Sequence, residues 1–327
     1  MKRSTLRRAG GTVALGLTLT LSVAACGGQD ATGTDPSASG GSAAAISGEV
    51  IADGSSTVAP LTSAAGELFK QEQPGVNVSV GTSGTGGGFE KFCQGQLDLS
   101  DASRAIKDEE KAGCEKAGVT YTELRVATDA LSVVVSKDNS FLTCLTTAQL
   151  KTLWAPEAEG KIKTWNQVDP KFPNQPIQLF GPGTDSGTFD YFTAEINGKA
   201  GASRSDYNAS EDDNVLVQGV AGSANALGYF GYTYLEENPD KLKAVQVDSG
   251  AGCVSPSAET AQDASYTPLS RPLFVYVSNQ AFTTKPQVKA FVEWMAKNDE
   301  PVTKAAKFIP LNAEQRTTLQ TAATSIT

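Results

Sequence analysis

Segments typical of strands alternate with segments typical of helices along this chain, and that alternation limits its possible folds more than any other feature. Apolar runs typical of strands occupy residues 76–80, 131–136, 177–180, 243–247 and 272–278. Stripes of apolar residues at helical spacing lie between them, over residues 58–69, 189–196 and 288–295. Strands that alternate with helices indicate an α/β fold with mostly parallel sheets.

Three of the strand-to-helix corners have similar composition. Glycine, serine and threonine dominate at residues 54–57 (GSST), 81–88 (GTSGTGGG) and 181–188 (GPGTDSGT). The first N–H groups of a helix lack internal partners, and the helix dipole adds partial positive charge there. In open α/β sheets, ligands bind outside the carboxyl ends of strands. Three such corners that converge would form a cage of uncharged donors suited to a small oxyanion.

Each corner has a plainer explanation when it is taken alone. Serine and threonine are good helix N-caps, and glycine is common in loops. A Walker-type phosphate loop is excluded at all three corners, because none ends in Gly-Lys-Ser or Gly-Lys-Thr. Arg104 lies in the run LDLSDASRAI, where a guanidinium could grip an oxyanion with two parallel hydrogen bonds. A single arginine is more often a surface salt-bridge partner.

The N-terminal segment has the pattern of an export signal. Residues 1–25 place basic side chains before an apolar stretch that is short for a membrane span. This stretch ends in VAAC, which resembles a bacterial lipobox and predicts a lipidated Cys26. An ordinary signal peptide with an incidental cysteine is the alternative, and Sec and twin-Arg export both stay open. Residues 26–45 are rich in glycine, serine and alanine, and we expect a flexible tether.

Charge and composition exclude several functions. Loss of the four basic signal residues would change the formal net charge from −9 to −13, which argues against nucleic acid as a partner. The sequence contains no histidine, so Ser-His-Asp and Cys-His catalysis and imidazole metal ligands are excluded. Ser186 lacks the Gly-x-Ser-x-Gly elbow of many hydrolases. We therefore expect neither an enzyme nor a protein with a metal or cofactor.

Four cysteines follow Cys26, and an even number in an exported protein favours two disulfides. Three pairings are open. We favour Cys93 with Cys114, which closes a short loop, and Cys144 with Cys253, which closes a long one.

Five long motifs in this chain resemble those of one known family. They are DGSSTVAPL (53–61), GTSGTGGGFEKFCQGQLDLSDASRAI (81–106), FGPGTDSGTFDYF (180–192), ALGYFGYTYLEEN (226–238) and PLSRPLFVYVSN (268–279). The family is that of the phosphate-binding lipoproteins of the high-affinity bacterial phosphate ABC transporter. The resemblance spans about residues 49 to 300. It implies a two-lobed periplasmic-binding-protein fold of type II, which closes on inorganic phosphate in a cleft between the lobes and delivers it to a membrane permease.

The resemblance also implies which residues bind phosphate. The family's phosphate-binding groups match residues in all three corners of this chain. They are Ser56, Thr57 and the Val58 amide in the first corner, Ser83 in the second, and Ser186, Gly187 and Thr188 in the third. Two positions depart from the family pattern. Pro182 replaces an arginine before Ser-Gly-Thr, and Ser103, followed by Arg104, replaces an aspartate. Arg104 therefore becomes the predicted cation.

The missing aspartate is the group that accepts the proton of hydrogen phosphate in the best-known members of the family. Asp185, Asp101 and Asp53 are the candidates to replace it in this chain, and we choose Asp185. Pairing with Arg104 or helix capping is the plainer role for Asp185.

We expect residues 46–130 plus 270–327 to form one lobe and residues 131–269 to form the other. Hinge strands near residues 127–136 and 268–278 would join them. The protein would be a monomer on the outer face of the cytoplasmic membrane. A site for another tetrahedral oxyanion, such as sulfate or molybdate, is the main alternative, followed by a surface lipoprotein without a transport role.

The lipobox yields a direct prediction. Replacing Cys26 with serine removes the sulfur that would carry the lipid, so the variant should be released into the medium. Stable anchoring needs two acyl chains, because one chain binds a membrane only marginally. Without Cys26 the protein carries neither chain, so the anchor should be lost completely. Fractionation of cells followed by immunoblotting measures this. A variant that stays with the membrane would contradict the lipobox assignment.

Overall fold

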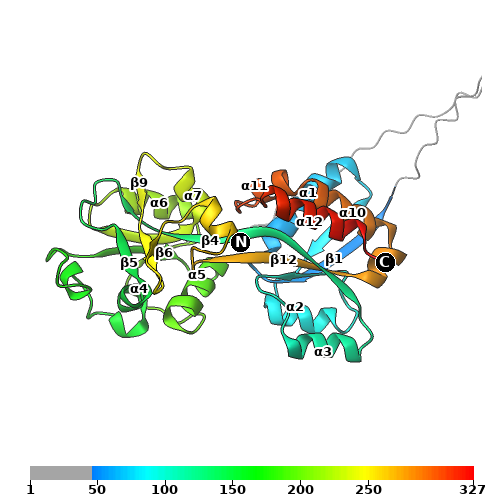
Figure 1. The fold of residues 1–327 in the computed structure, drawn as a ribbon, viewed down its shortest axis with the longest axis horizontal. Coiled ribbons are helices and arrows are strands. Elements are labelled where there is room, and N and C mark those ends of the chain that lie inside the picture. The colour runs from blue at the N-terminus through cyan, green and yellow to red at the C-terminus, as the bar shows by residue number, and fades with distance from the viewer. Residues whose placement is uncertain (1–45) are drawn as a thin grey trace, which may run out of the picture. The chain divides into compact units, whose positions relative to one another are not determined.

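The computed structural model describes residues 46–327, which form an α/β protein with two lobes (Figure 1). The predicted signal peptide, Cys26 and the tether fall within residues 1–45 and lie outside the described residues. Within residues 46–327, none of the helices combines the length and apolar character needed to span a membrane. The same residues contain no cluster of histidine, cysteine and acidic side chains that could hold a metal ion.

Strands and helices alternate as the sequence predicts. The first part of the chain contains β1 (Gly48–Gly54), α1 (Ala59–Glu72), β2 (Val76–Val80), α2 (Gly84–Phe92), β3 (Leu99–Ala102), α3 (Asp108–Lys116) and β4 (Tyr121–Ser136). The last part contains β12 (Ser270–Ser278), α9 (Asn279–Thr284), α10 (Pro286–Lys297), α11 (Asp299–Ala305) and α12 (Ala313–Thr324).

The middle of the chain has shorter elements. They are β5 (Cys144–Thr146), α4 (Thr147–Trp154), the 3-10 helices η1 (Pro156–Ala158) and η2 (Trp165–Gln167), β6 (Gln178–Pro182), α5 (Gly187–Phe192) and the π-helix η3 (Thr193–Asn197). They continue with β7 (Asn208–Ser210), α6 (Asp213–Ala221), β8 (Ala226–Gly231), α7 (Tyr232–Glu236), β9 (Leu242–Ala244), β10 (Gln246–Asp248), β11 (Cys253–Val254) and α8 (Ala258–Gln262).

One pair of antiparallel strands connects the lobes. β4 pairs with β12 along residues 121–130 and with β8 along residues 131–135. The strand order is β2-β1-β3-β12-β4-β8-β6-β7, and β1 and β6 pair in parallel with their neighbours. Figure 1 shows β4 and β12 lying side by side as they pass from one lobe to the other. The loops that follow β1 and β6 approach each other, since a Cβ at Gly187 would lie 2.6 Å from Thr57 Oγ1.

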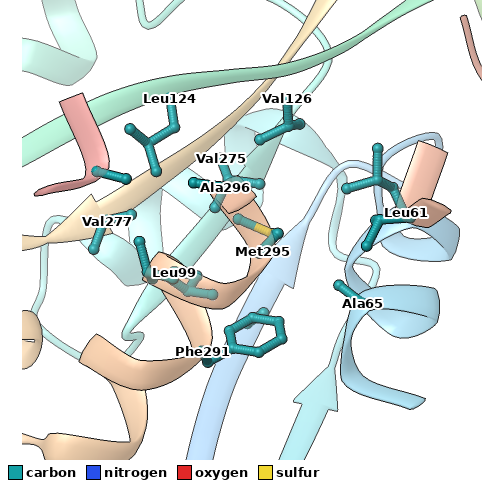
Figure 2. Packing of buried hydrophobic residues seen from close by; sticks show 14 of the residues in the cluster. Leu61, Ala65, Leu99, Leu124, Val126, Val275, Val277, Phe291, Met295 and Ala296 are labelled. Carbon is teal, nitrogen blue, oxygen red and sulfur yellow. The ribbon is translucent and has the colours of Figure 1, made fainter. Parts of the chain in front are cut away.

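Each lobe has its own hydrophobic core. In the first lobe, α1 and α10 pack apolar faces against β1, β3, β4 and β12, as Figure 2 shows for Leu61, Leu99 and Phe291. In the second lobe, Trp154 and Trp165 are fully buried, and the rings of Phe192 and Tyr229 stack 3.7 Å apart. These aromatic groups bury large apolar areas, which fixes α4 and α5 against the sheet.

Two local expectations are wrong. Residues 243–247 do not form one strand, because the chain changes partner at Val245: β9 pairs with β4, whereas β10 pairs with β5. The glycines of the second corner also do not form a loop, since α2 begins at Gly84 and contains the rest of them. A Cβ at Gly88 would lie 2.6 Å from the Cα of Gly54. Glycine in α2 therefore permits a close approach to the end of β1, which offsets its low helix propensity.

Both favoured disulfides are present. Cys93 at the end of α2 is bonded to Cys114 of α3, and Cys144 of β5 is bonded to Cys253 of β11. The first joins two helices next to the second corner, and the second closes a separation of 109 residues within the other lobe.

Candidate functional site

A cleft of about 720 Å³ lies between the lobes where the three corners meet the crossing strands. Its walls come from the loop before α1, the start of α2, the segment after β3, the helix α5 with η3, and the start of β12. Each of these segments adjoins or belongs to a strand or helix, so both lobes contribute walls to the cleft.

The first corner is held against β3. Gly54 has φ +144°, and a Cβ there would lie 2.1 Å from the carbonyl oxygen of Asp101, so only glycine fits. The next amide, that of Ser55, donates to the same carbonyl at 2.9 Å. The Val58 amide donates to the carbonyl of Ser55 at 3.1 Å, and the Val58 side chain is buried. The hydroxyl-bearing residues Ser56 and Thr57 line the cleft, whereas Val58 supports the loop from within.

The second corner is organised by Asp53. The amide and the hydroxyl of Ser83 donate to Asp53 Oδ1 at 2.8 and 2.9 Å, and Lys91 forms an ion pair with Oδ2. Burial alone would raise the pKa of Asp53, but the contacts with Lys91, Ser83 and the Gly54 amide lower it to about 2. Ser83 is thereby turned toward Asp53, and its neighbours Gly84 and Thr85 line the cleft instead.

The third corner lies against the first corner. Ser186 caps α5, accepting a hydrogen bond from the Thr188 amide at 3.2 Å. Gly187 lines the cleft, and a Cβ there would lie 2.6 Å from Thr57 Oγ1. Neither Ser186 nor Thr188 contributes to the lining, although both flank Gly187. The start of α5 therefore faces the first corner across the cleft.

The predicted acceptor, Asp185, has a different position from the one expected. It is exposed, its amide donates to Glu211 Oε1 at 3.3 Å, and it does not line the cleft. The acidic residues that do line the cleft are Asp190 of α5 and Glu195 of η3. The sequence reasoning missed both, although Asp190 belongs to the motif FGPGTDSGTFDYF.

Arg104, the predicted cation, lines the cleft together with Ser103. Its two terminal nitrogens donate to the carboxylate of Glu110 at 2.8 and 2.7 Å. These hydrogen bonds raise the pKa of Arg104 above its ordinary value. The Ser103 hydroxyl lies 3.1 Å from that of Thr85, which links the second corner to the segment after β3.

A second arginine, Arg271 of β12, also lines the cleft, and the sequence reasoning missed it. Its Nε donates to Asp129 Oδ2 at 3.1 Å, and its Nη2 donates to Thr57 Oγ1 at 3.0 Å. Its guanidinium carbon lies 3.6 Å from the centre of the Tyr191 ring. Burial raises the pKa of Asp129, and the charge of Arg271 opposes that rise. The only signal was the motif PLSRPLFVYVSN, which contains this arginine.

Asp101 lies behind the first corner and does not line the cleft. It is fully buried, and its Oδ1 accepts a hydrogen bond from the Thr62 hydroxyl at 2.8 Å. Its Oδ2 has no hydrogen-bond partner among residues 46–327. Burial raises the pKa of Asp101 to about 7, and the Thr62 hydroxyl only partly opposes this. The pKa of Asp101 therefore lies close to neutral pH.

Comparisons with known proteins agree with this architecture. A family model described as a PBP superfamily domain matches residues 39–299. A protein of known structure from Planctomyces limnophilus, described as a possible phosphate binding protein, superposes with a TM-score of 0.81 and 44% identity, over 86% of this chain and 99% of that one.

Two curated relatives are similar over most of their length. Protein SphX of Synechococcus elongatus is 47% identical over 269 residues, which is 82% of this chain and 79% of the relative. The phosphate-binding protein PstS of Staphylococcus saprophyticus is 40% identical over 311 residues, which is 95% of this chain and 92% of the relative.

Asp101 leads to a pH prediction. Its folded-state pKa of about 7 lies above the unfolded value near 3.8, so folding favours the protonated carboxyl. The resulting stabilisation of the folded state is fully present below about pH 4 and is lost as the pH rises through about 7. Asp101→Asn keeps an oxygen for Thr62 but cannot ionise. The free energy of unfolding of the wild type should therefore fall relative to that of the variant as the pH rises. The difference should widen by on the order of 2 to 4 kcal/mol between pH 4.5 and pH 8.

Urea denaturation at several pH values, in phosphate-free buffer, measures this difference. Ser100→Ala is the matched control, because Ser100 is buried on the same strand and does not titrate. If the difference between Asp101→Asn and wild type stays constant from pH 4.5 to 8, Asp101 does not have a raised pKa.

Proposed function

Since the chain belongs to the PBP superfamily and to the family that contains the phosphate-binding protein PstS and protein SphX, we propose that it binds inorganic phosphate between its lobes. The bound phosphate passes to the membrane permease subunits of a phosphate ABC transporter. Proteins of this family bind and deliver a substrate and are not enzymes. The protein acts as a monomer outside the cytoplasmic membrane, held there by a lipid on Cys26.

The observation that carries this proposal is the meeting of the three corners at one cleft. Thr57 of the first corner, Thr85 of the second and Gly187 of the third all line it. The start of a helix offers free N–H groups and partial positive charge, and hydroxyl groups add further donors. A small tetrahedral oxyanion needs donors from several directions, and this cleft supplies them from both lobes.

Ten residues make up the proposed phosphate site, in two groups. The residues that line the cleft contact the anion: Ser56, Thr57, Ser103, Arg104 and Gly187. The others support or flank them: Val58, Ser83, Asp185, Ser186 and Thr188. We propose that the lobes divide at residues 130/131 and 269/270. The anion would then lie beside the crossing strands, because residues of β12 line the cleft.

Selectivity for phosphate depends on a carboxylate that accepts the proton of hydrogen phosphate. Sulfate carries no such proton at neutral pH, so the same carboxylate would repel it. Asp185 is the predicted acceptor, and Asp190 and Glu195 are the acidic residues that line the cleft. A site that hydrogen-bonds one specific donor can reject an analogue without it by about 10⁴-fold.

Titration calorimetry with phosphate, sulfate and molybdate tests the function. We expect the wild type to bind phosphate and to reject sulfate by about 10⁴-fold. Asp185→Asn, Asp190→Asn and Glu195→Gln keep size and shape, and only the variant that removes the acceptor should lose this discrimination. Equal affinity for sulfate or molybdate would leave a general oxyanion site. A wild type that binds none of the three would support a surface lipoprotein without a transport role.

Closure of the lobes gives a second prediction. Gly187→Ala adds a methyl group 2.6 Å from Thr57 Oγ1, closer than a normal van der Waals contact, so it should hold the lobes apart. Phosphate binding should weaken by about 1 to 3 kcal/mol, the usual cost of overpacking. Gly86→Ala is the control, because the nearest atom to its added Cβ, Arg104 Nη2, is 3.9 Å away. Equal affinities for both variants would mean that the first and third corners do not meet in the bound state.

A further inference from the structure

Arg271 differs from Arg104 in where it lies and in what it contacts. It belongs to β12, one of the two strands that pass between the lobes, and its register partner on β4 is Asp129. Its side chain is 17% exposed and lines the cleft, while that of Asp129 is 7% exposed. Arg271 therefore lies on a crossing strand, at the edge of the cleft, and its placement depends on its pairing with Asp129.

The guanidinium of Arg271 contacts both lobes. One face lies on the ring of Tyr191 in α5, at 3.6 Å from the ring centre, and Nη2 donates to Thr57 at 3.0 Å. Tyr191 is held in turn by a hydrogen bond of 2.6 Å from its hydroxyl to the carbonyl of Pro268. Stacking on an aromatic ring fixes the plane of a guanidinium, and all of its N–H groups point outward in that plane.

The remaining donors of Arg271 are available to a ligand. Nε is used by Asp129 and Nη2 by Thr57, while no hydrogen bond within residues 46–327 uses Nη1. Arg104, in contrast, directs both terminal nitrogens at Glu110, and its Nη1 also donates to the carbonyl of Ala105 at 3.1 Å. Of the two arginines in the cleft, Arg271 keeps one terminal nitrogen without a protein acceptor in the described part of the chain.

We propose that Arg271 is a further phosphate-binding residue, which donates to the anion from Nη1 and from the second N–H of Nη2 while Asp129 and Tyr191 hold it in place. This inference rests on the proposed function of the cleft. It adds a ligand from the crossing strands to those from the three corners. Because Thr57 and Tyr191 belong to opposite lobes, an anion on Arg271 lies where the lobes approach each other, and its binding favours the closed arrangement.

Removal of Arg271 alone would leave the carboxylate of Asp129 buried without a partner, so a single variant could lose binding through misfolding. The double variant Arg271→Gln/Asp129→Asn removes both charges and keeps similar shapes. If Arg271 serves only to neutralise Asp129, this double variant should bind phosphate like the wild type. If Arg271 binds the anion, the double variant should stay weak.

The chain offers a matched control pair. Arg316 donates to Asp299 at 3.0 Å, and the Asp299 side chain is 3% exposed, but neither residue lines the cleft. Arg316→Gln/Asp299→Asn therefore removes another arginine paired with a buried carboxylate, although Arg316 also contacts Glu300 at 3.5 Å. Its melting temperature should change about as much as that of the cleft double variant, while its phosphate affinity should match that of the wild type.

Calorimetric titration of inorganic phosphate into the wild type, the two double variants and Arg271→Lys tests the inference. We expect the cleft double variant to lose at least about 30-fold in affinity, the lower end for truncation of one partner of a buried charge pair. Arg271→Lys, which keeps a charge beside Asp129, should fold normally and still lose about 10-fold or more, because an ammonium lacks the planar fork. This second variant keeps the test decisive if the double variant does not fold.

Two outcomes would overturn the inference, and they are distinguishable. A wild type that binds phosphate, with Arg271→Lys and the cleft double variant within about threefold of it, would show that Arg271 is only a partner for Asp129. A wild type that binds no oxyanion would overturn the proposed function itself, and the inference with it, before any variant is compared.

Discussion

The pairing of β4 with β12 determines where every other part of the cleft lies. β4 contributes Leu124 and Val126 to one hydrophobic core and Val133 and Val135 to the other, so it is fixed at both ends by burial. The register of β4 and β12 shifts between Leu273 and Phe274, next to a proline that has no N–H to donate. Any relative movement of the lobes must therefore bend these two strands, close to Arg271.

The net negative charge of this chain should disfavour anion binding, but the contacts within the cleft explain how an anion can still bind. The formal net charge of the whole sequence is −9, yet both arginines of the cleft are already paired with carboxylates, Arg104 with Glu110 and Arg271 with Asp129. Apart from the N–H groups that Arg271 keeps free within residues 46–327, the donors offered to the ligand are therefore neutral amides and hydroxyls at helix starts. Their effect at short range in a partly buried cleft outweighs the screened charge of the distant surface.

The parts of the fold that follow from local sequence were predictable, and the parts that follow from strand pairing were not. The strand at residues 76–80 and the helix over residues 58–69 agree with β2 and α1, because apolar periodicity is a local property. The division of residues 243–247 into β9 and β10 depends on which strands lie alongside, which the run itself does not contain. Fold class and the convergence of the corners were within reach of the sequence.

Individual site residues were harder to place for the same reason. Arg271 faces the cleft because its register partner is Asp129, more than a hundred residues away, and no motif displays that register. Ser83 is turned inward by Asp53, and Asp185 is exposed beside Glu211, so residues inside a correct motif can still lie off the cleft. Motifs locate the corners, whereas long-range hydrogen bonds decide which side chains face the ligand.

The central claim is that one oxyanion is held by both lobes at the crossing strands. A crystal structure of the protein with arsenate, which has the shape of phosphate and can be located by its anomalous scattering, tests this most directly. We predict a single arsenic peak in the cleft, with oxygens within hydrogen-bonding distance of Thr57, Arg271 and the start of α5. An arsenic peak that contacts only one lobe, or that lies outside the cleft, would contradict the claim.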